Sequence, residues 1–384
     1  MSELSYLEKL LDGVEVEWLP LAKVCRLING RAYKQEELLS KGKYPVLRVG
    51  NFFTNQNWYY SDLELDQDKY CDNGDLLYAW SASFGPRIWH GGKSIYHYHI
   101  WKVVPDSNLI CKQFLYYLLQ WDTKALKGAH STGSTMMHIS KTTIEKRLVP
   151  IPCPDNPEKS LAIQSEIVRI LDKFTELTAE LTAELSMRKK QYNYYRDQLL
   201  NLEGRENTRE MRIGDIYDFQ YGTGNTIPKS GGQYPVYGSN GIVGSHDKYN
   251  SEDSPVIGHI GAYAGIVNWG QGKHFVTYNG VICRHKSKEV LQKYAYYLLL
   301  LQDFGSKSNS ASQPFVSYNI LNAPIVLVPP LQEQARIVAI LDKFDTLTNS
   351  ITEGLPREIE LRQKQYEYYR DLLFSFPKPE TASN

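Results

Sequence analysis

The sequence predicts an α+β protein with two similar β-rich domains. Two long helices separate these domains and are expected to pair as an antiparallel coiled coil about a pseudo-twofold axis. The first observation is a repeat: the patterns I-V-x-I-L-D-K-F and K-Q-Y-x-Y-Y-R-D occur in residues 161–200 and again in 331–374. A repeat of this length indicates that one structural plan occurs twice. The second observation is a seam of apolar residues in each copy. The third is that short strand-like runs separated by glycines precede each copy.

Composition places the chain among globular proteins with room for more than one core. Of its 384 residues, 42% are hydrophobic and 22% charged, and the formal net charge is zero. A neutral chain argues against a strongly electrostatic DNA-binding protein. The five cysteines are scattered without a C-x-x-C pair, which favours reduced thiols in a cytoplasmic protein. We expect no signal peptide and no membrane, because no apolar stretch is long enough to span one.

Changes in texture divide the chain into six segments. These are an N-terminal helix (1–16), a first β-rich domain (17–156, domain 1), a central long helix with its linker (157–208), a second β-rich domain (209–329, domain 2), a C-terminal long helix (330–374) and a disordered tail (375–384). Proline-rich stretches precede both long helices, as expected at element boundaries. Within domain 1, one helix is expected near 112–121.

The two β-rich domains share spaced landmarks. Gly30 matches Gly222, Trp89 matches Trp269, and Ser140 matches Ser317. Most residues between such landmarks differ, so one fold is expected with two different surfaces.

Both long helices carry a coiled-coil seam. Apolar residues of the first helix recur in steps of four and three, and the unit T-A-E-L occurs twice at 178–185. The second helix contains Gly354-Leu-Pro356. Because a proline inside a helix costs about 3 kcal/mol, we expect two helical segments, with Pro356 near the start of the second.

Motifs for catalysis are missing. The sequence contains no N-P-P-[FY], no G-x-x-x-x-G-K-[ST] and no G-x-S-x-G. His97 and His99 would share one strand face, but no third metal ligand lies at a suggestive spacing. The sequence therefore favours a protein that binds and organises over an enzyme, with no metal site.

Glycine-rich loops of both domains offer groups that could bind DNA. Glycines allow close approach to a polyanion, and short polar or basic side chains read base edges or phosphates. The candidate DNA-binding residues are Ser81, Ser83, Arg87, Lys93, Ser134, Thr135, His138, Ser239, Asn240, Tyr263, Lys273, Ser312 and Gln313. Each loop could equally be an ordinary hairpin connection. Residues 17–155 hold 17 basic and 13 acidic residues and residues 209–329 hold 10 and 8, so the positive excess is modest.

The repeated tyrosine-rich motif is the candidate partner surface. Its residues are Tyr192, Tyr195 and Arg196 in the first copy and Tyr366, Tyr369 and Arg370 in the second. Two equivalent partner sites would keep these residues in both copies, and internal packing alone would do the same.

Taken together, the I-L-D-K-F and K-Q-Y-x-Y-Y-R-D repeat, the proline boundaries, and the W-S-A-S-F-G and I-G-A-Y-A-G stretches resemble the specificity subunit of type I restriction–modification systems. The T-A-E-L repeat resembles the IC-type branch. The resemblance implies that each β-rich domain is a target recognition domain reading one half of a split, asymmetric DNA sequence. It implies that the helices set the spacer between the halves.

The resemblance also implies partners and cofactors. Two methyltransferase subunits, which bind S-adenosylmethionine, would dock on the chain, and two restriction subunits that use ATP with magnesium would join them. This chain itself would bind no cofactor and catalyse no reaction. The alternative hypothesis is a coiled-coil scaffold whose β-rich domains bind protein or carbohydrate.

Overall fold

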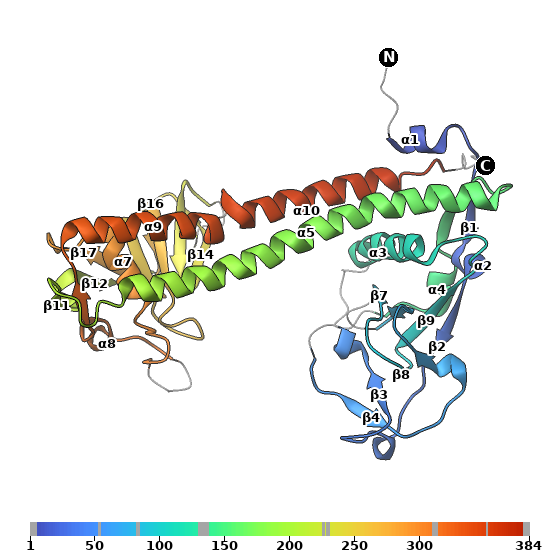
Figure 1. Ribbon diagram of the computed structural model, residues 1–384, viewed down its shortest axis with the longest axis horizontal. Helices are drawn as coiled ribbons and strands as arrows, with labels where there is room; N and C mark the ends of the chain where they lie inside the picture. The colour runs from blue at the N-terminus through green and yellow to red at the C-terminus, as the bar shows by residue number, and fades with distance from the viewer. Residues whose placement is uncertain are drawn as a thin grey trace. The chain divides into compact units, whose positions relative to one another are not determined.

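One helix, α5, runs without interruption from Pro157 to Leu200 and belongs to both halves of the protein (Figure 1). The computed structural model describes residues 6–52, 55–81, 85–129, 138–224, 227, 231–308, 314–350 and 352–378. The chain divides into unit 1 (residues 1–180 and 360–384) and unit 2 (residues 181–359). Each unit holds one β-rich domain and part of the long helices. The α+β class with two β-rich domains and a long helix is therefore confirmed.

Unit 1 is built around domain 1. Its helices are α1 (Tyr6–Leu11), α2 (Leu21–Val24), α3 (Lys112–Ala129) and α4 (Lys141–Glu145), with 3-10 turns η1 (Gln35–Glu37), η2 (Val49–Phe52) and η3 (Gln67–Lys69). Its strands are β1 (Val16–Pro20), β2 (Cys25–Asn29), β3 (Tyr44–Leu47), β4 (Tyr59–Ser61), β5 (Tyr70–Cys71), β6 (Leu76–Ala79), β7 (Gly85–Ile88), β8 (Ser94–Tyr96), β9 (Ile100–Pro105) and β10 (Leu148–Pro152). They form sheets in the orders β2-β9-β6-β7, β4-β3-β8-β5 and β1-β10.

Unit 2 is built around domain 2. Its helices are α6 (Ile213–Ile216), α7 (Gln292–Leu300), α8 (Tyr318–Asn322) and α9 (Leu331–Asn349). Its strands are β11 (Arg209–Arg212), β12 (Tyr217–Tyr221), β13 (Tyr234–Gly238), β14 (Gly241–His246), β15 (Ser251–Gly258), β16 (Val267–Val276), β17 (Gly280–His285) and β18 (Ile325–Val328). They form sheets in the orders β12-β17-β15-β16-β13-β14 and β11-β18.

The strand pairings of the two domains correspond. The order β2-β9-β6-β7 in domain 1 matches β12-β17-β15-β16 in domain 2, and β1-β10 matches β11-β18. The parallel strand pairings also correspond, because β3 runs parallel to β8 as β13 does to the end of β16. The internal repeat in the sequence is therefore a repeated strand topology.

The matched glycines lie where two chain segments nearly touch. A Cβ on Gly30 would lie 2.2 Å from the carbonyl oxygen of Tyr96, and a Cβ on Gly222 would lie 2.1 Å from that of Thr277. Real Cβ atoms do not approach backbone oxygens this closely, so only glycine fits either position. The matched serines are helix caps: Ser140 accepts a hydrogen bond from the Thr143 amide, and Ser317 accepts one from the Ile320 amide.

A buried glutamine ties each domain to the long helix that follows it. Gln164 of α5 accepts a hydrogen bond from the Cys111 amide at 2.9 Å and donates to the Leu109 carbonyl at 2.9 Å. In unit 2, Gln334 of α9 makes the same pair of hydrogen bonds, with the Leu291 amide at 2.8 Å and the Glu289 carbonyl at 2.9 Å. Both glutamine side chains thus satisfy the backbone of the loop that leads into α3 or α7.

The aspartate of the I-L-D-K-F repeat accepts a hydrogen bond from a tyrosine of the preceding domain in both units. The Tyr117 hydroxyl of α3 donates to Asp172 at 2.5 Å, and the Tyr297 hydroxyl of α7 donates to Asp342 at 2.5 Å. Burial, together with the neighbouring carboxylate, raises the pKa of both tyrosines, so both remain protonated donors.

The C-terminal long helix is broken, as predicted. α9 ends at Asn349 and α10 begins at Gly354, which places Pro356 in the first turn of α10 (Gly354–Leu373). Gly354 has a φ of +80°, and a Cβ there would lie 2.4 Å from the Thr346 carbonyl oxygen. The backbone at the break therefore requires a glycine at position 354.

Contacts between the long helices occur within both units. In unit 1, Phe174 of α5 stacks on Tyr369 of α10 with ring centroids 5.3 Å apart. In unit 2, Tyr195 of α5 stacks on Phe344 of α9 at 5.7 Å. Pairing over the full length as an antiparallel coiled coil, with a pseudo-twofold axis, stays a prediction.

The prediction of a disordered tail is wrong at its start. Phe376 is only 4% exposed and packs edge-on against Phe114 of α3, and the Trp18 indole donates a hydrogen bond to the Pro377 carbonyl at 2.7 Å. Composition suggested disorder, but two aromatic contacts and one hydrogen bond hold the segment to domain 1. Residues 379–384 lie outside the described residues.

Replacing Gly30 by alanine tests the close approach in domain 1. G30A should lower the free energy of unfolding by about 1–3 kcal/mol, the usual cost of forcing extra atoms into a packed site. G222A should do the same in domain 2. Denaturant unfolding of the full chain measures both. G92A is the matched control, because a Cβ on Gly92 meets nothing within 4 Å. Equal stability of G30A and G92A would contradict the interpretation.

Candidate nucleic-acid interface

The predicted DNA-binding residues separate into three groups in the structure. Five of them lie outside the described residues: Ser83, Ser134, Thr135, Ser312 and Gln313. Others lie at the turns after β6 and β15, in the turn between β13 and β14, or just before α4. Arg87 and Lys273 lie on strands, and Lys93 directly precedes β8. The groups are taken in turn, beginning with the turns.

An aromatic cluster, cluster 1, lies after the end of β6 in domain 1. The Trp80 ring meets the His99 ring at 4.9 Å and the His138 ring at 5.9 Å, and its indole donates to the Tyr98 carbonyl at 2.8 Å. The backbone of Trp80 is held on both sides. Its amide donates to the His99 carbonyl, and its carbonyl accepts from the Ile139 amide.

Ser81 and His138 have different places in cluster 1. Their backbones form an isolated β-bridge, which confirms that the two loops meet. The Ser81 residue is only 5% exposed, whereas His138 is exposed. Ser81 is therefore placed to shape the turn, and His138 is placed at its surface.

Two neighbouring imidazoles, His99 of cluster 1 and His97 with its ring 4.8 Å away, are neutral. Burial lowers the pKa of His97 to about 4, with smaller contributions from His99 and Arg48. Burial likewise lowers the pKa of His99, and His138 adds to this effect. Both rings are uncharged near pH 7, so they offer hydrogen bonds and ring faces rather than positive charge.

A second aromatic cluster, cluster 2, occupies the corresponding place in domain 2. The amide of His259 donates to the Asn279 carbonyl, and its carbonyl accepts from the Val316 amide. These are the backbone bonds that hold Trp80, since Asn279 lies 180 positions after His99. The His259 ring stacks on Tyr221 at 4.1 Å, and Tyr221 stacks on Tyr318 at 4.2 Å. One backbone arrangement thus carries tryptophan in one domain and histidine in the other.

Three turns of domain 2 meet beside cluster 2. The Ser239 hydroxyl lies 2.9 Å from the Ile260 carbonyl and 3.1 Å from the Asn279 carbonyl, so its proton is shared between backbone oxygens. The Ser239 hydroxyl therefore ties the turns together, and DNA binding by Ser239 stays a prediction. The turns enclose a surface hollow of about 330 Å³, lined by Ile227, Gly238, Ser239, Asn240, Val243, Tyr263, Thr277 and Asn279. Asn240 and Tyr263, both predicted sites, are exposed on its wall.

The predicted basic residues are not brought to the clusters by any described contact. Lys93 lies with its Nζ 4.4 Å from the centre of the Tyr70 ring, on the sheet that contains β8. Lys273 lies in the same way 4.7 Å from the centre of the Tyr249 ring. Arg87 is exposed on β7. DNA binding by these three residues stays a prediction.

Sequence interpretation singled out His138 of cluster 1 as a DNA-binding candidate but not Trp80, Tyr221, His259 or Tyr318. Tyr221 ends β12 and His259 follows β15, so their ring contact joins segments that are distant in sequence. A signal was present in Tyr98 and Tyr278, which are 180 positions apart like the matched Trp89 and Trp269.

Some of the candidate partner-binding residues are buried and others are exposed to solvent. Tyr192 is 6% exposed and Arg370 is 8% exposed, and the Arg370 guanidinium contacts the neighbouring Asp371. Tyr195 and Tyr369 are exposed on one face, although each stacks on a phenylalanine. The remaining candidates, Arg196 and Tyr366, are partly exposed. Partner binding at this motif stays a prediction, and the exposed tyrosines are the members able to meet a partner directly.

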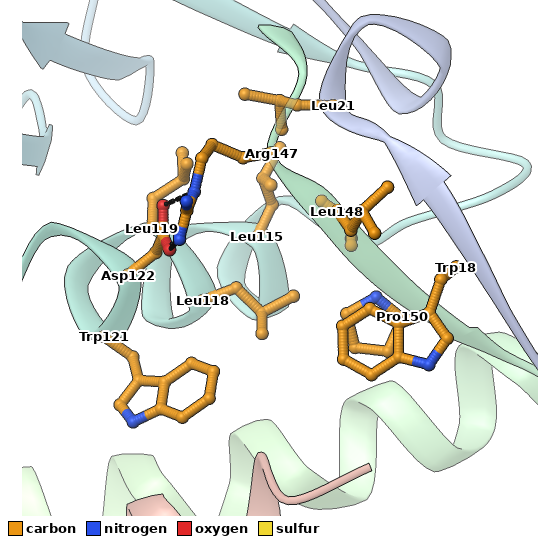
Figure 2. A pocket seen from close by; sticks show the side chains of 11 residues that line it. Trp18, Leu21, Leu115, Leu118, Leu119, Trp121, Asp122, Arg147, Leu148 and Pro150 are labelled. Atoms are coloured by element: carbon orange, nitrogen blue, oxygen red, sulfur yellow. Dashed lines mark hydrogen bonds and ion pairs between the residues drawn. The ribbon is translucent and has the colours of Figure 1, made fainter. Parts of the chain in front are cut away.

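The enclosed pocket of domain 1 is too small to be a ligand site. Figure 2 shows Trp18, Trp121 and Leu118 around it, with the Asp122–Arg147 ion pair at one end. Its volume is about 40 Å³, room for no more than a few water molecules. Among the residues that the structure describes, no cluster of three potential metal ligands occurs, and no helix is long and apolar enough to cross a membrane.

Comparison with known proteins gives consistent matches along the chain. The model of the family described as the type I restriction modification DNA specificity domain matches residues 14–187 and 205–361. The chain is 40% identical to the EcoR124I/EcoR124II specificity subunit of Escherichia coli, with 100% of both chains covered. It is 38% identical to the EcoprrI specificity subunit of the same organism, with 92% of this chain and 93% of that protein covered.

Solved structures show the same fold at lower identity. The S subunit of a type I restriction–modification system from M. genitalium aligns with a TM-score of 0.60 at 18% identity and covers 96% of this chain and 98% of its own. A chain from a structure of complex assembly in a type I restriction–modification system aligns with a TM-score of 0.55 at 15% identity, covering 94% and 97%.

Acidification tests the buried state of His97. The ordinary pKa of histidine is 6.5 and that of His97 is about 4, so the unfolded chain binds the proton first. Stability is therefore full above pH 6.5 and is lost as the pH falls toward 4. Between pH 7.5 and pH 5, the melting temperature should fall less for the H97Q variant than for wild type. The H90Q variant, at an exposed histidine of the same domain, is the control and should retain the wild-type slope. Identical slopes for wild type and H97Q would disprove the assignment.

Proposed function

This chain belongs to the type I restriction–modification DNA specificity family, and we propose that domain 1 and domain 2 each read one half of a split DNA target. One observation carries the proposal. The same backbone arrangement holds Trp80 beside His99 in domain 1 and His259 beside Asn279 in domain 2. A framework that repeats while the side chains it carries differ is suited to reading two different half-sites, so the target should be asymmetric.

The long helices have two roles in this proposal. They set the spacer between the half-sites, and the exposed tyrosines of the repeated motif dock two methyltransferase subunits. Two restriction subunits complete the complex, which acts in the cytoplasm. S-adenosylmethionine, and ATP with magnesium, bind to those partner subunits, while this chain binds no cofactor and contributes no catalytic group.

Exchange of one domain tests the division of labour. Residues 17–155 are replaced by the equivalent segment of another family member, and the variant is produced in cells with its methyltransferase and restriction subunits. One half of the methylated sequence should change and the other should remain, because domain 2 is intact. Sequencing of methylated positions in the cellular DNA measures this.

Two outcomes would reject the proposal. A change in both halves would show that the domains do not read separately. Absence of any defined methylated sequence with the wild-type chain, together with binding of the purified complex to protein or carbohydrate instead of DNA, would favour the scaffold alternative.

Lengthening α5 tests the spacer role. The T-A-E-L units at 178–185 lie inside the continuous helix, so one further unit adds about 6 Å at ~1.5 Å per residue. Since base pairs rise by ~3.4 Å, the gap between half-sites should grow by one or two base pairs while both half-sites stay unchanged.

The matched control changes sequence without length. Replacing one T-A-E-L unit by A-A-E-A keeps the helix length and should leave the gap as in wild type. An unchanged gap between the half-sites after insertion of the unit would refute the spacer role of α5.

A further inference from the structure

The hollow of domain 2 brings an exposed carboxamide and apolar side chains together on one wall. Asn240 occupies a two-residue turn between β13 and β14, whose flanking glycines, Gly238 and Gly241, are paired across the hairpin. The side chain of Asn240 is exposed on the wall of the hollow. Val243 and Ile227 provide an apolar part of the same wall.

The backbone around the hollow is held in place from three directions. Besides the Ser239 hydroxyl, the backbone oxygens of Ser239 and Tyr263 crowd the site of Gly258, where a Cβ would lie 2.4 Å and 2.3 Å from them. The turns therefore cannot separate without losing this packing. Preorganisation of this kind reduces the ordering cost that a reading site has to overcome on binding.

We propose that this hollow reads one A·T base pair in the major groove of the half-site recognised by domain 2. The Asn240 carboxamide carries a donor and an acceptor on a short stem, the pattern that matches N7 and the 6-amino group of adenine. Val243 and Ile227 supply the apolar surface that receives the thymine methyl group. This inference rests on the proposed function and names the base pair that one part of it recognises.

Domain 1 does not carry the same set of groups. Counted from the corresponding parallel pairings, the position of Asn240 is taken by Gly50, which has no side chain to read with. His99 stands where domain 2 has Asn279. The A·T contact should therefore be confined to the half-site of domain 2.

A change of carboxamide to carboxylate tests the contact directly. In N240D the side chain keeps its shape but loses its donor, and a carboxylate accepts from the 4-amino group of cytosine. Duplexes varied at each position of both half-sites are bound to the complex with its methyltransferase subunits. At one position of the domain 2 half-site, wild type should prefer adenine and N240D should prefer cytosine, with a change of roughly 5- to 150-fold, the discrimination of a bidentate contact.

Deoxyuridine tests the methyl contact at the same position. Replacing the paired thymine by deoxyuridine removes only the methyl group and should weaken wild-type binding. V243A should lose this sensitivity while retaining the preference for A·T. I242A is the matched control: Ile242 is an exposed neighbour outside the hollow, and its variant should respond to deoxyuridine as wild type does.

The outcomes separate this inference from the function on which it rests. Unchanged preference in N240D at every position, or a change confined to the half-site of domain 1, overturns the inference and leaves the proposed function standing. A wild-type complex with no preference at any position overturns the proposed function itself.

Discussion

The buried carboxamides of Gln164 and Gln334 are the constraint on which the rest of the structure depends. Each satisfies one backbone amide and one backbone carbonyl of the loop before α3 or α7. Without that side chain, these partly buried groups would lose their hydrogen-bond partner, at a cost of up to about 1–3 kcal/mol each. Because α5 and α9 each dock an equivalent loop, both carry a glutamine six residues before the I-L-D-K-F motif, whose aspartate makes a second equivalent contact to α3 or α7.

Each domain is attached to a long helix by contacts that do not involve the turns of cluster 1 or cluster 2, so residues at these turns can differ between the domains. The contacts that hold domain to helix, such as Tyr117 with Asp172, lie on α3 and α5 and not at the turns that carry the clusters. Trp80 and His259 are held by backbone hydrogen bonds that any residue can make. Exposed side chains at these turns, such as His138 and Tyr263, can therefore change while the backbone framework and the core stay the same.

Structural features could be predicted from the sequence where only one or two residue types can adopt the required backbone conformation. The Gly354–Pro356 break and the two matched glycines could be predicted because few other residues fit such backbones. Hydroxyl side chains were harder, because a serine can read DNA or satisfy a nearby carbonyl equally well. Ser239 does the second, and only the meeting of three turns distant in sequence reveals it. Phe376 was misjudged in the same way, because its partner Phe114 is far away in sequence.

The small charge excess of the domains bears on how such a chain achieves affinity. Electrostatic attachment to DNA scales with the number of phosphates that basic residues neutralise. Residues 209–329 carry 10 basic against 8 acidic residues, and Lys273 and Lys286 are already engaged with a tyrosine ring and an aspartate. Domain 2 is therefore poorly equipped to hold DNA through charge alone. In the proposed function, its contribution is discrimination between sequences, made by groups on preorganised turns.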